Sequence, residues 1–266
     1  EPIRSEHLQM GGKAPDGGSI DVNNYYIVRD GKPVIPVMGE FHYSRYPAEQ
    51  WEQEIIKMKA GGVNVIPSYI FWSLHEPVEG KFCWEGNLNL RRFIELCKKH
   101  DMLSLIHDMD VIVRIGPFGH GEIRSGALPD WLFTKNLDVR SNDSKYLAYT
   151  KILYTEIAKQ LQGLYYKDGG PIIGCQLENE HQHSAAPWAI NYAGEKVLDF
   201  TAASYDKGIT KLGVSVQEGN ISAAELGDRH MATLQRMAEE AGIITPFYTA
   251  TGWGNAAVIP GKAIPV

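Results

Sequence analysis

Two carboxylates close an apolar run in the second half of the chain. The segment Gln176-Leu177-Glu178-Asn179-Glu180 follows residues with the character of a buried strand. Alternate side chains of a strand share a face, so Gln176, Glu178 and Glu180 are expected to point the same way. A carboxyl group crowded by another carboxylate has a raised pKa, which suits a general acid near neutral pH. The spacing alone also fits an acidic surface loop that follows a strand.

Two further segments could bind a ligand rich in hydroxyl groups. Residues 114–122 contain several glycines, which let a backbone approach a ligand closely, and His120 and Glu122 there could hydrogen-bond hydroxyl groups. Residues 68–77 carry aromatic side chains at a strand end, which suits the apolar face and polar rim of a sugar ring. The alternatives are a glycine-rich turn with a capping Glu and, for the aromatic residues, core packing. Core packing is the interpretation that we keep for Phe71.

Alternating β-rich and amphipathic runs must position these segments. The strands are expected at residues 34–45, 63–72, 111–118, 172–180 and 243–251, and the helices at 47–60, 90–97, 149–164 and 231–241. Repeated β-then-α units predict a parallel sheet, in a (β/α)8 barrel or an open doubly wound fold. The first strand–helix junction lacks Gly-x-Gly-x-x-Gly, which weighs against a dinucleotide fold. Because polar and aromatic residues follow the C-terminal ends of the strands, we favour the barrel.

The composition narrows the classes of function. The 266 residues contain 26 basic and 32 acidic side chains, a net charge of −6, and the three cysteines are expected to be free thiols. A nucleic-acid partner is not expected, because a phosphate-binding surface needs a basic excess. No apolar run reaches the roughly 20 residues of a membrane span. The compartment stays open, and a secreted or periplasmic location is expected if a signal peptide has been removed.

Taken together, the motifs resemble glycoside hydrolase family 35, the β-galactosidases. The matching segments are 39–45, 69–77, 114–118, 121–122, 128–132, 169–173 and 176–180, with a weaker likeness at 246–252. They follow one another in the order of the family. The resemblance implies a (β/α)8 TIM barrel that is incomplete here, with about five of eight strands. Residues 1–266 would then be the N-terminal portion of a single catalytic domain.

The resemblance also implies an activity and its residues. The family hydrolyses terminal β-D-galactosides with retention of configuration, and neither a cofactor nor a metal is expected. Glu180 falls on the general acid/base, and its neighbour Asn179 would bond the sugar 2-hydroxyl. Tyr69, His120 and Glu122 fall on positions that contact galactose hydroxyls.

The second carboxylate of the mechanism is expected beyond this chain. A retaining enzyme needs two carboxylates about 5–5.5 Å apart, and in the resembled family the nucleophile is a Glu after strand seven. Glu178 cannot take that role, because it lies two residues from Glu180 on one strand. We therefore expect the nucleophile and the last strands to follow Val266, and the 266-residue chain alone to be inactive.

The chain departs from the family pattern around the pocket. Ser73 stands where Asn is usual, Ile123 where Trp is usual, and His181-Gln182 where Tyr-Gly is usual. The alternatives are a β-glucosaminidase or β-glucosidase of the same clan, or a non-catalytic sugar-binding remnant. A metal hydrolase, prompted by the segment from His181 to His183, is a further alternative, for which a polar loop is the simpler interpretation.

Two segments are unusual in length or in repetition. The polar stretch 181–226 is longer than expected, and Trp188 and Tyr192 within it could shape a leaving-group subsite. His-Asp-Met occurs twice, at 100–102 and 107–109, and we expect this repeat to add helix or a bulged loop.

Overall fold

The computed structural model of the chain describes residues 3, 12–23, 25–99, 109–181, 223–250 and 263–265. Its helices and strands are β1 (Ile20–Val22), β2 (Ile27–Arg29), β3 (Lys32–Val34), α1 (Trp51–Ala60), β4 (Val65–Tyr69), α2 (Trp72–His75), α3 (Leu90–Lys99), β5 (Asp110–Arg114), α4 (Ser144–Leu161), β6 (Ile172–Leu177), α6 (Ala223–Glu240), β7 (Phe247–Thr249) and β8 (Ala263–Pro265). The polar stretch after His181, with Trp188 and Tyr192, and the His-Asp-Met repeat up to Asp108 lie outside these ranges.

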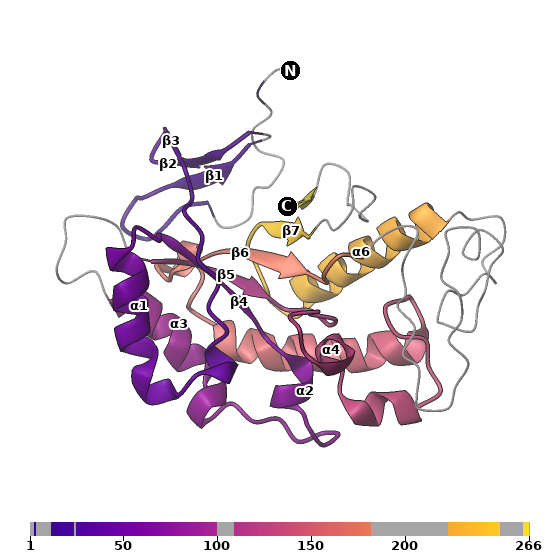
Figure 1. The fold of residues 1–266 in the computed structure, drawn as a ribbon. Coiled ribbons are helices and arrows are strands. Elements are labelled where there is room, and N and C mark those ends of the chain that lie inside the picture. The colour runs from indigo at the N-terminus through magenta and orange to yellow at the C-terminus, as the bar shows by residue number, and fades with distance from the viewer. Residues whose placement is uncertain are drawn as a thin grey trace.

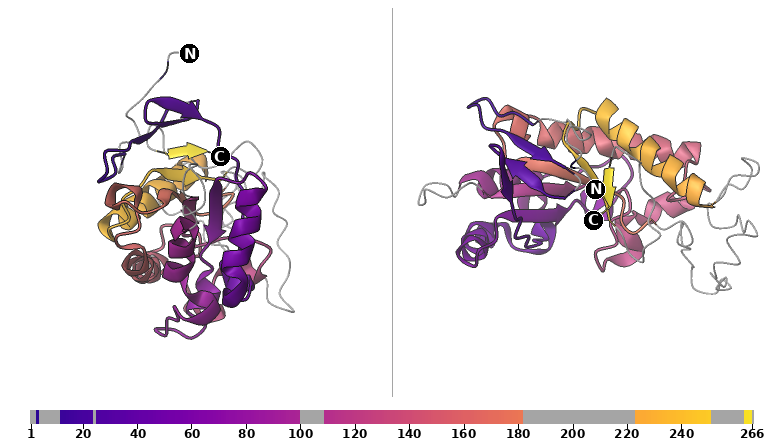
Figure 2. Two further views of the ribbon diagram at one scale, coloured as in Figure 1. Left: turned by 90° about the vertical axis from the view of Figure 1, so that its left-hand side faces the viewer. Right: turned by 90° about the horizontal axis from the view of Figure 1, so that it is seen from above.

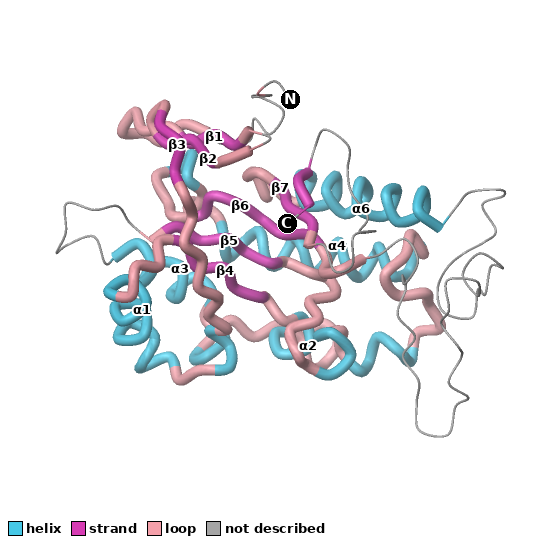
Figure 3. The backbone as a smooth tube through the Cα atoms, turned by 45° about the horizontal axis from the view of Figure 1, so that its top comes forward, coloured by secondary structure: helices cyan, strands magenta, loops and turns pink. Residues whose placement is uncertain are grey.

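The larger sheet has five strands in the order β4-β5-β6-β7-β8, and every pair in it is parallel. This confirms the parallel sheet that the repeated β-then-α units predict. Figure 3 shows β4, β5 and β6 side by side. Their register sets Tyr69 opposite Arg114, and Arg114 opposite Gln176, at the C-terminal ends of the three strands. The segments that could do chemistry therefore meet at one end of the sheet.

The expected first strand, residues 34–45, runs parallel to β4 without forming a regular ladder. The Gly39 N–H donates to the Val65 carbonyl at 3.0 Å, and the Phe41 N–H donates to the Pro67 carbonyl at 3.1 Å. Because Pro67 has no N–H, it cannot return a hydrogen bond, and regular pairing stops there. This stretch is thus a neighbour of β4, as predicted, but an irregular one.

One face of the larger sheet packs against the helices. Ile66 of β4, Val113 of β5 and Leu177 of β6 are buried in one cluster with the apolar faces of α1, α3, α4 and α6. Figure 2 shows α4 and α6 side by side. The helical stripes that the sequence indicated are buried: Trp51, Ile55, Phe93, Ile94, Cys97, Leu153, Ile157, Leu161, Met231, Leu234 and Met237. Among the described residues, no helix is both long enough and apolar enough to span a bilayer.

The long helix α4 begins earlier than the predicted range 149–164 because its cap lies upstream. The Asp143 carboxylate accepts hydrogen bonds from the N–H groups of Lys145 and Tyr146, both at 2.9 Å. An Asp at this position satisfies N–H groups that have no partner within the helix.

A small antiparallel sheet, β1–β3, covers the other face of the larger sheet. Its Ile20, Val22 and Ile27 form a buried cluster with Val65 and Ile173 of the larger sheet, near the N-terminal ends of the strands. Figure 1 shows it above the larger sheet, with α3 and α4 below. Strands of three residues show too little alternation to be predicted. This cover leaves the C-terminal ends of the strands as the end that can receive a ligand.

Candidate active site

Three side chains from adjacent strands converge on the amide oxygen of Asn179. Asn179 Oδ1 accepts three hydrogen bonds. The donors are the Tyr69 hydroxyl at 3.2 Å, Arg114 Nη2 at 2.6 Å and Gln176 Nε2 at 3.2 Å. Arginine can only donate, so the oxygen of the amide must face it. The Asn179 amide nitrogen then points the other way and can donate to a ligand.

Arg114 organises the charges of this end of the sheet. Its guanidinium carbon lies 3.5 Å from the centroid of the Tyr69 ring, and the group forms an ion pair with Glu40. Glu40 also lies 3.5 Å from His42 Nε2. Burial raises the pKa of Glu40, but its contacts with His42 and Arg114 outweigh burial and the pKa is lowered. Glu40 therefore stays ionised and compensates the buried cation.

Burial and four charged side chains set the pKa of the Tyr69 hydroxyl. Burial raises its pKa to about 12, against the opposing influence of Arg114, and the charges of Glu40, Glu122 and Glu180 contribute to the rise. Tyr69 is consequently a neutral phenol at neutral pH. The charges of two predicted site residues, Glu122 and Glu180, thus act on the same hydroxyl group.

The glycine-rich loop after β5 presents His120 and Glu122 at this end of the sheet. Both residues have left-handed backbone, with φ of 54° and 48°, and Glu122 is exposed while His120 is half-buried. One of the glycines has a role in packing. A Cβ at Gly121 would lie 2.6 Å from Phe71 Cε1, so Gly121 allows the loop to pack closely against an aromatic ring of the protein.

The aromatic segment after β4 divides between core and site. Tyr69 faces the candidate site, whereas Phe71 is fully buried, which confirms the core interpretation. Trp72 is fully buried too and donates to Glu76 Oε2 at 2.6 Å. Neither Trp72 nor Glu76 is therefore placed to contact a sugar ring.

The shared face expected for Gln176, Glu178 and Glu180 is not found. Strand β6 ends at Leu177, and Glu178 and Glu180 have left-handed backbone with φ of 55° and 48°. Glu178 is 1% exposed and binds Arg140 through both carboxylate oxygens, at 2.8 and 2.7 Å. Glu180 is half-buried. Period-two alternation fails here because it holds only in an extended strand.

Arg114, Glu40 and Arg140 were not predicted as site residues. A charge at the end of the apolar run 110–114 is a signal for Arg114, because inward-facing charges are rare in barrel walls. Glu40 lies in a motif that the sequence did single out. Arg140 lies in a loop with no motif around it.

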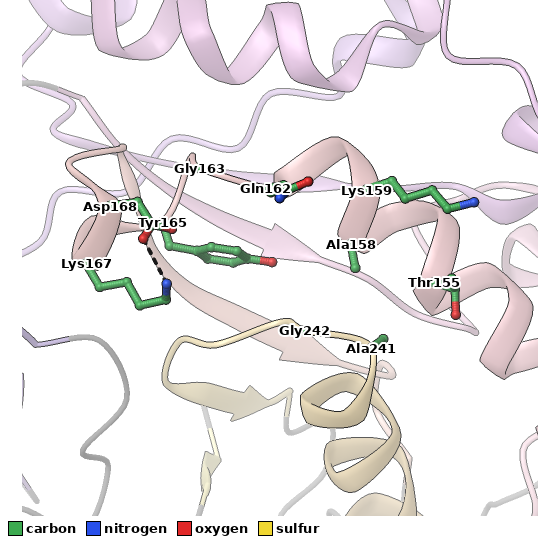
Figure 4. Close-up of a pocket in the computed structure, with 10 residues that line it drawn as sticks. All are labelled: Thr155, Ala158, Lys159, Gln162, Gly163, Tyr165, Lys167, Asp168, Ala241 and Gly242. Carbon is green, nitrogen blue, oxygen red and sulfur yellow. Dashed lines mark hydrogen bonds and ion pairs between the residues drawn. The ribbon is translucent and has the colours of Figure 1, made fainter.

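Among the described residues, neither a cluster of metal-binding side chains nor the pocket between α4 and α6 coincides with this region. In the part of the chain that the structure describes, no three His, Cys, Asp or Glu side chains lie close enough together to hold a metal ion, and His183 lies outside that part. A pocket of about 370 Å³ lies between the ends of α4 and α6 (Figure 4). It is lined by Thr155, Ala158, Lys159, Gln162, Gly163, Tyr165, Lys167, Asp168, Ala241 and Gly242. These residues precede β6 and β7, at the end of the sheet opposite Asn179.

Known proteins of similar sequence are β-galactosidases. The chain is 36% identical over 183 residues to a beta-galactosidase of Xanthomonas manihotis, covering 68% of this chain and 29% of that protein. It is 30% identical over 254 residues to the beta-galactosidase of Bos taurus, covering 88% of this chain and 37% of that protein. The chain thus spans well under half the length of these relatives.

Solved structures of similar shape are glycosidases with a TIM-barrel fold. The beta-galactosidase from Marinomonas ef1 matches with a TM-score of 0.52 at 13% identity, covering 84% of this chain and 38% of that one. GH5_18 from Streptomyces cattleya, in complex with GlcNAc, matches with a TM-score of 0.52 at 13% identity, covering 81% and 44%. At this identity the likeness shows the fold alone, a (β/α)8 barrel that is incomplete in this chain.

The family itself follows from a match to its sequence model. The model of glycosyl hydrolases family 35 matches residues 26–246. The matched residues include strands β4, β5 and β6 and the residues that hydrogen-bond Asn179. By sequence, the chain belongs to glycoside hydrolase family 35.

Proposed function

We propose that this protein cleaves terminal β-D-galactosyl residues from β-galactosides with retention of configuration. The observation that carries the proposal is the hydrogen-bond network at Asn179, the residue before Glu180, whose amide oxygen accepts from Tyr69, Arg114 and Gln176. Membership of family 35 and the beta-galactosidase names of the relatives support the choice of substrate. Residues 1–266 are proposed as the N-terminal portion of one catalytic domain, completed by the rest of the barrel.

In the proposed reaction Glu180 acts twice. Protonated, it gives its proton to the glycosidic oxygen while a second carboxylate attacks the anomeric carbon. Ionised, it then takes a proton from the water that releases the sugar. The nucleophile is proposed to lie beyond the present sequence. Glu178 cannot supply it, because both of its oxygens are bound to Arg140.

The surrounding residues are proposed to hold the sugar. The Asn179 amide nitrogen is suited to bond the 2-hydroxyl, because three donors occupy the amide oxygen. Tyr69, His120 and Glu122 are suited to bond other hydroxyl groups, since the phenol oxygen, whose proton is donated to Asn179, and the exposed carboxylate can both accept.

The test uses full-length protein and nitrophenyl glycosides of galactose, glucose and N-acetylglucosamine. Selective hydrolysis of the galactoside is expected. A preference for either of the other two sugars would favour the clan alternatives. Galactose binding in calorimetry without turnover of any glycoside would favour the sugar-binding remnant.

The role of Glu180 is tested separately with Glu180→Gln. This variant should lose far more activity on a poor alkyl leaving group than on dinitrophenyl galactoside, because an activated leaving group needs little protonation. The control is Glu95→Gln, which changes a half-exposed ion pair on α3. Equal losses on both substrates would contradict the assignment.

A further inference from the structure

We propose that Arg140 is a positioning residue for Glu180, acting through the residues on both sides of it. Arg140 lies in the loop before α4, and its side chain reaches the residues that follow β6. Its Nε donates to Glu178 Oε1 at 2.8 Å, and its Nη2 donates to Glu178 Oε2 at 2.7 Å. The same Nη2 also donates to the carbonyl of Asn179 at 2.8 Å. One guanidinium thus fixes both residues that precede Glu180.

The residue that follows Glu180 is bound to the same loop. His181 Nε2 donates to the carbonyl of Arg140 at 2.9 Å. His181 is buried, and its ring centroid lies 5.1 Å from that of His230 on α6. Arg140 therefore contacts positions 178, 179 and 181, and Glu180 is the residue between them.

The backbone needs such restraint. Glu178, Glu180 and Arg140 have φ of 55°, 48° and 56°. Left-handed backbone costs about 1–3 kcal/mol for such a residue and persists only where the surroundings enforce it. The pair that enforces it here is itself held, because both side chains are 1% exposed and the guanidinium carbon lies 3.8 Å from the centroid of the Phe118 ring.

This geometry has a consequence for the proposed reaction, on which the inference rests. If residues 178–181 relaxed to an ordinary conformation, the carboxyl group of Glu180 would move relative to a bound sugar. A lysine at position 140 would keep the charge but lose the planar fork that binds two oxygens. A displacement of about 1 Å at a reacting group can cost about 100-fold in rate.

The experiment compares two variants of the full-length protein with a matched control. Arg140→Lys keeps the cation, and the double variant Arg140→Met/Glu178→Met removes the pair without leaving a buried charge unpaired. Arg29→Lys is the control, because Arg29 forms a partly buried ion pair with Asp110 at the opposite end of the sheet. Rates are measured for alkyl and dinitrophenyl galactosides, together with thermal unfolding.

Both Arg140 variants should lose roughly 10- to 100-fold in kcat on the alkyl galactoside and far less on the dinitrophenyl galactoside. Arg29→Lys should match the wild type on both substrates. Equal losses on both substrates, unchanged rates, or failure of both Arg140 variants to fold would overturn the positioning role. A wild-type protein that hydrolyses no galactoside would instead overturn the proposed function, and the inference with it.

Discussion

At the scale of single residues, the orientation of the Asn179 amide is fixed by three side chains from neighbouring strands. Arg114, Gln176 and Tyr69 all donate to its amide oxygen. Each comes from a different strand, so the orientation of the amide depends on the register of β4, β5 and β6. The group that Asn179 leaves for the proposed ligand is consequently the amide nitrogen, a donor.

The substitution Asn179→Asp removes the amide nitrogen but keeps an oxygen that can accept from Arg114. The carboxylate still accepts from Arg114 and gains a charge interaction with it, so stability should be equal or higher. Galactose affinity should fall by about tenfold, because a hydrogen bond is worth about 1 kcal/mol net and more when a buried partner is left unsatisfied. Calorimetry and thermal unfolding measure the two effects.

The control for this prediction is Asn89→Asp. Asn89 accepts from the N–H of Arg92 at the start of α3, where Asp serves as a cap equally well. Unchanged galactose affinity in Asn179→Asp would mean that the amide nitrogen does not contact the sugar.

At the scale of elements, α4 links the cap at Asp143 to the loop that carries Arg140. Its Tyr154 hydroxyl donates to the carbonyl of Gly116 at 2.9 Å, just before the glycine-rich loop after β5. The helix thus contacts the backbone near both loops of the candidate site. Its stability should depend on the cap.

Asp143→Ala should lower the free energy of unfolding by about 1 kcal/mol, because two N–H groups of α4 lose their acceptor. Denaturant unfolding monitored by circular dichroism measures this loss. Asp130→Ala is the control, since the ion pair of Asp130 with Arg124 is exposed and contributes little. Equal stability of the two variants would show that the cap is dispensable.

Continuous apolar runs and helical stripes were enough to predict β4, β5, β6 and the helices that cover them. The sequence could not show that Pro67 interrupts pairing with residues 37–41, because that effect belongs to the partner strand. It also gave no sign of the small sheet, whose strands are three residues long.

The residues of the candidate site likewise include some that the sequence predicts and some that it does not. Tyr69, Asn179 and Glu180 could be found because they lie in motifs at strand ends. Arg140 could not, because its pairing with Glu178 depends on how a loop folds back and not on local sequence. The left-handed backbone after Leu177 likewise follows from tertiary contacts.

At the scale of the whole molecule, the small sheet and the candidate site lie at opposite ends of the same strands. Ile27 packs against the larger sheet with a 9% exposed side chain, whereas nearby Ile35 is 85% exposed. Stability and ligand binding can therefore be changed independently at the two ends.

Ile27→Ala should lower the free energy of unfolding by about 2 kcal/mol, the low end for a buried isoleucine. Galactose affinity should not change, because the site lies at the other end of the strands. Ile35→Ala is the matched control and should be neutral in both measurements. A weakened affinity in Ile27→Ala would show that the two ends are coupled.

Acid should destabilise the folded chain through buried histidine. Burial lowers the pKa of His75 to about 4, although its hydrogen bond to the Cys83 carbonyl opposes this. The unfolded chain binds that proton near pH 6.5, so the unfolded state holds more protons between pH 6.5 and 4 and the free energy of unfolding falls as pH falls. The loss from His75 is on the order of 3 kcal/mol by pH 4.

Unfolding temperatures measured from pH 7 to pH 4 test this expectation. His75→Gln can keep bonds to Tyr43 and Cys83 without titrating, and it should show a shallower dependence on pH. Identical pH slopes in wild type and His75→Gln would contradict the assignment.

The sequential order of the strands has a consequence for synthesis on the ribosome. Each strand from β5 onward emerges next to a neighbour that has already been made, so the larger sheet can grow by one strand at a time. The small sheet emerges first, but Ile173 on β6, one of the residues that its apolar face covers, is translated much later. Until then that face is open to chaperones or to the same segment of a neighbouring nascent chain.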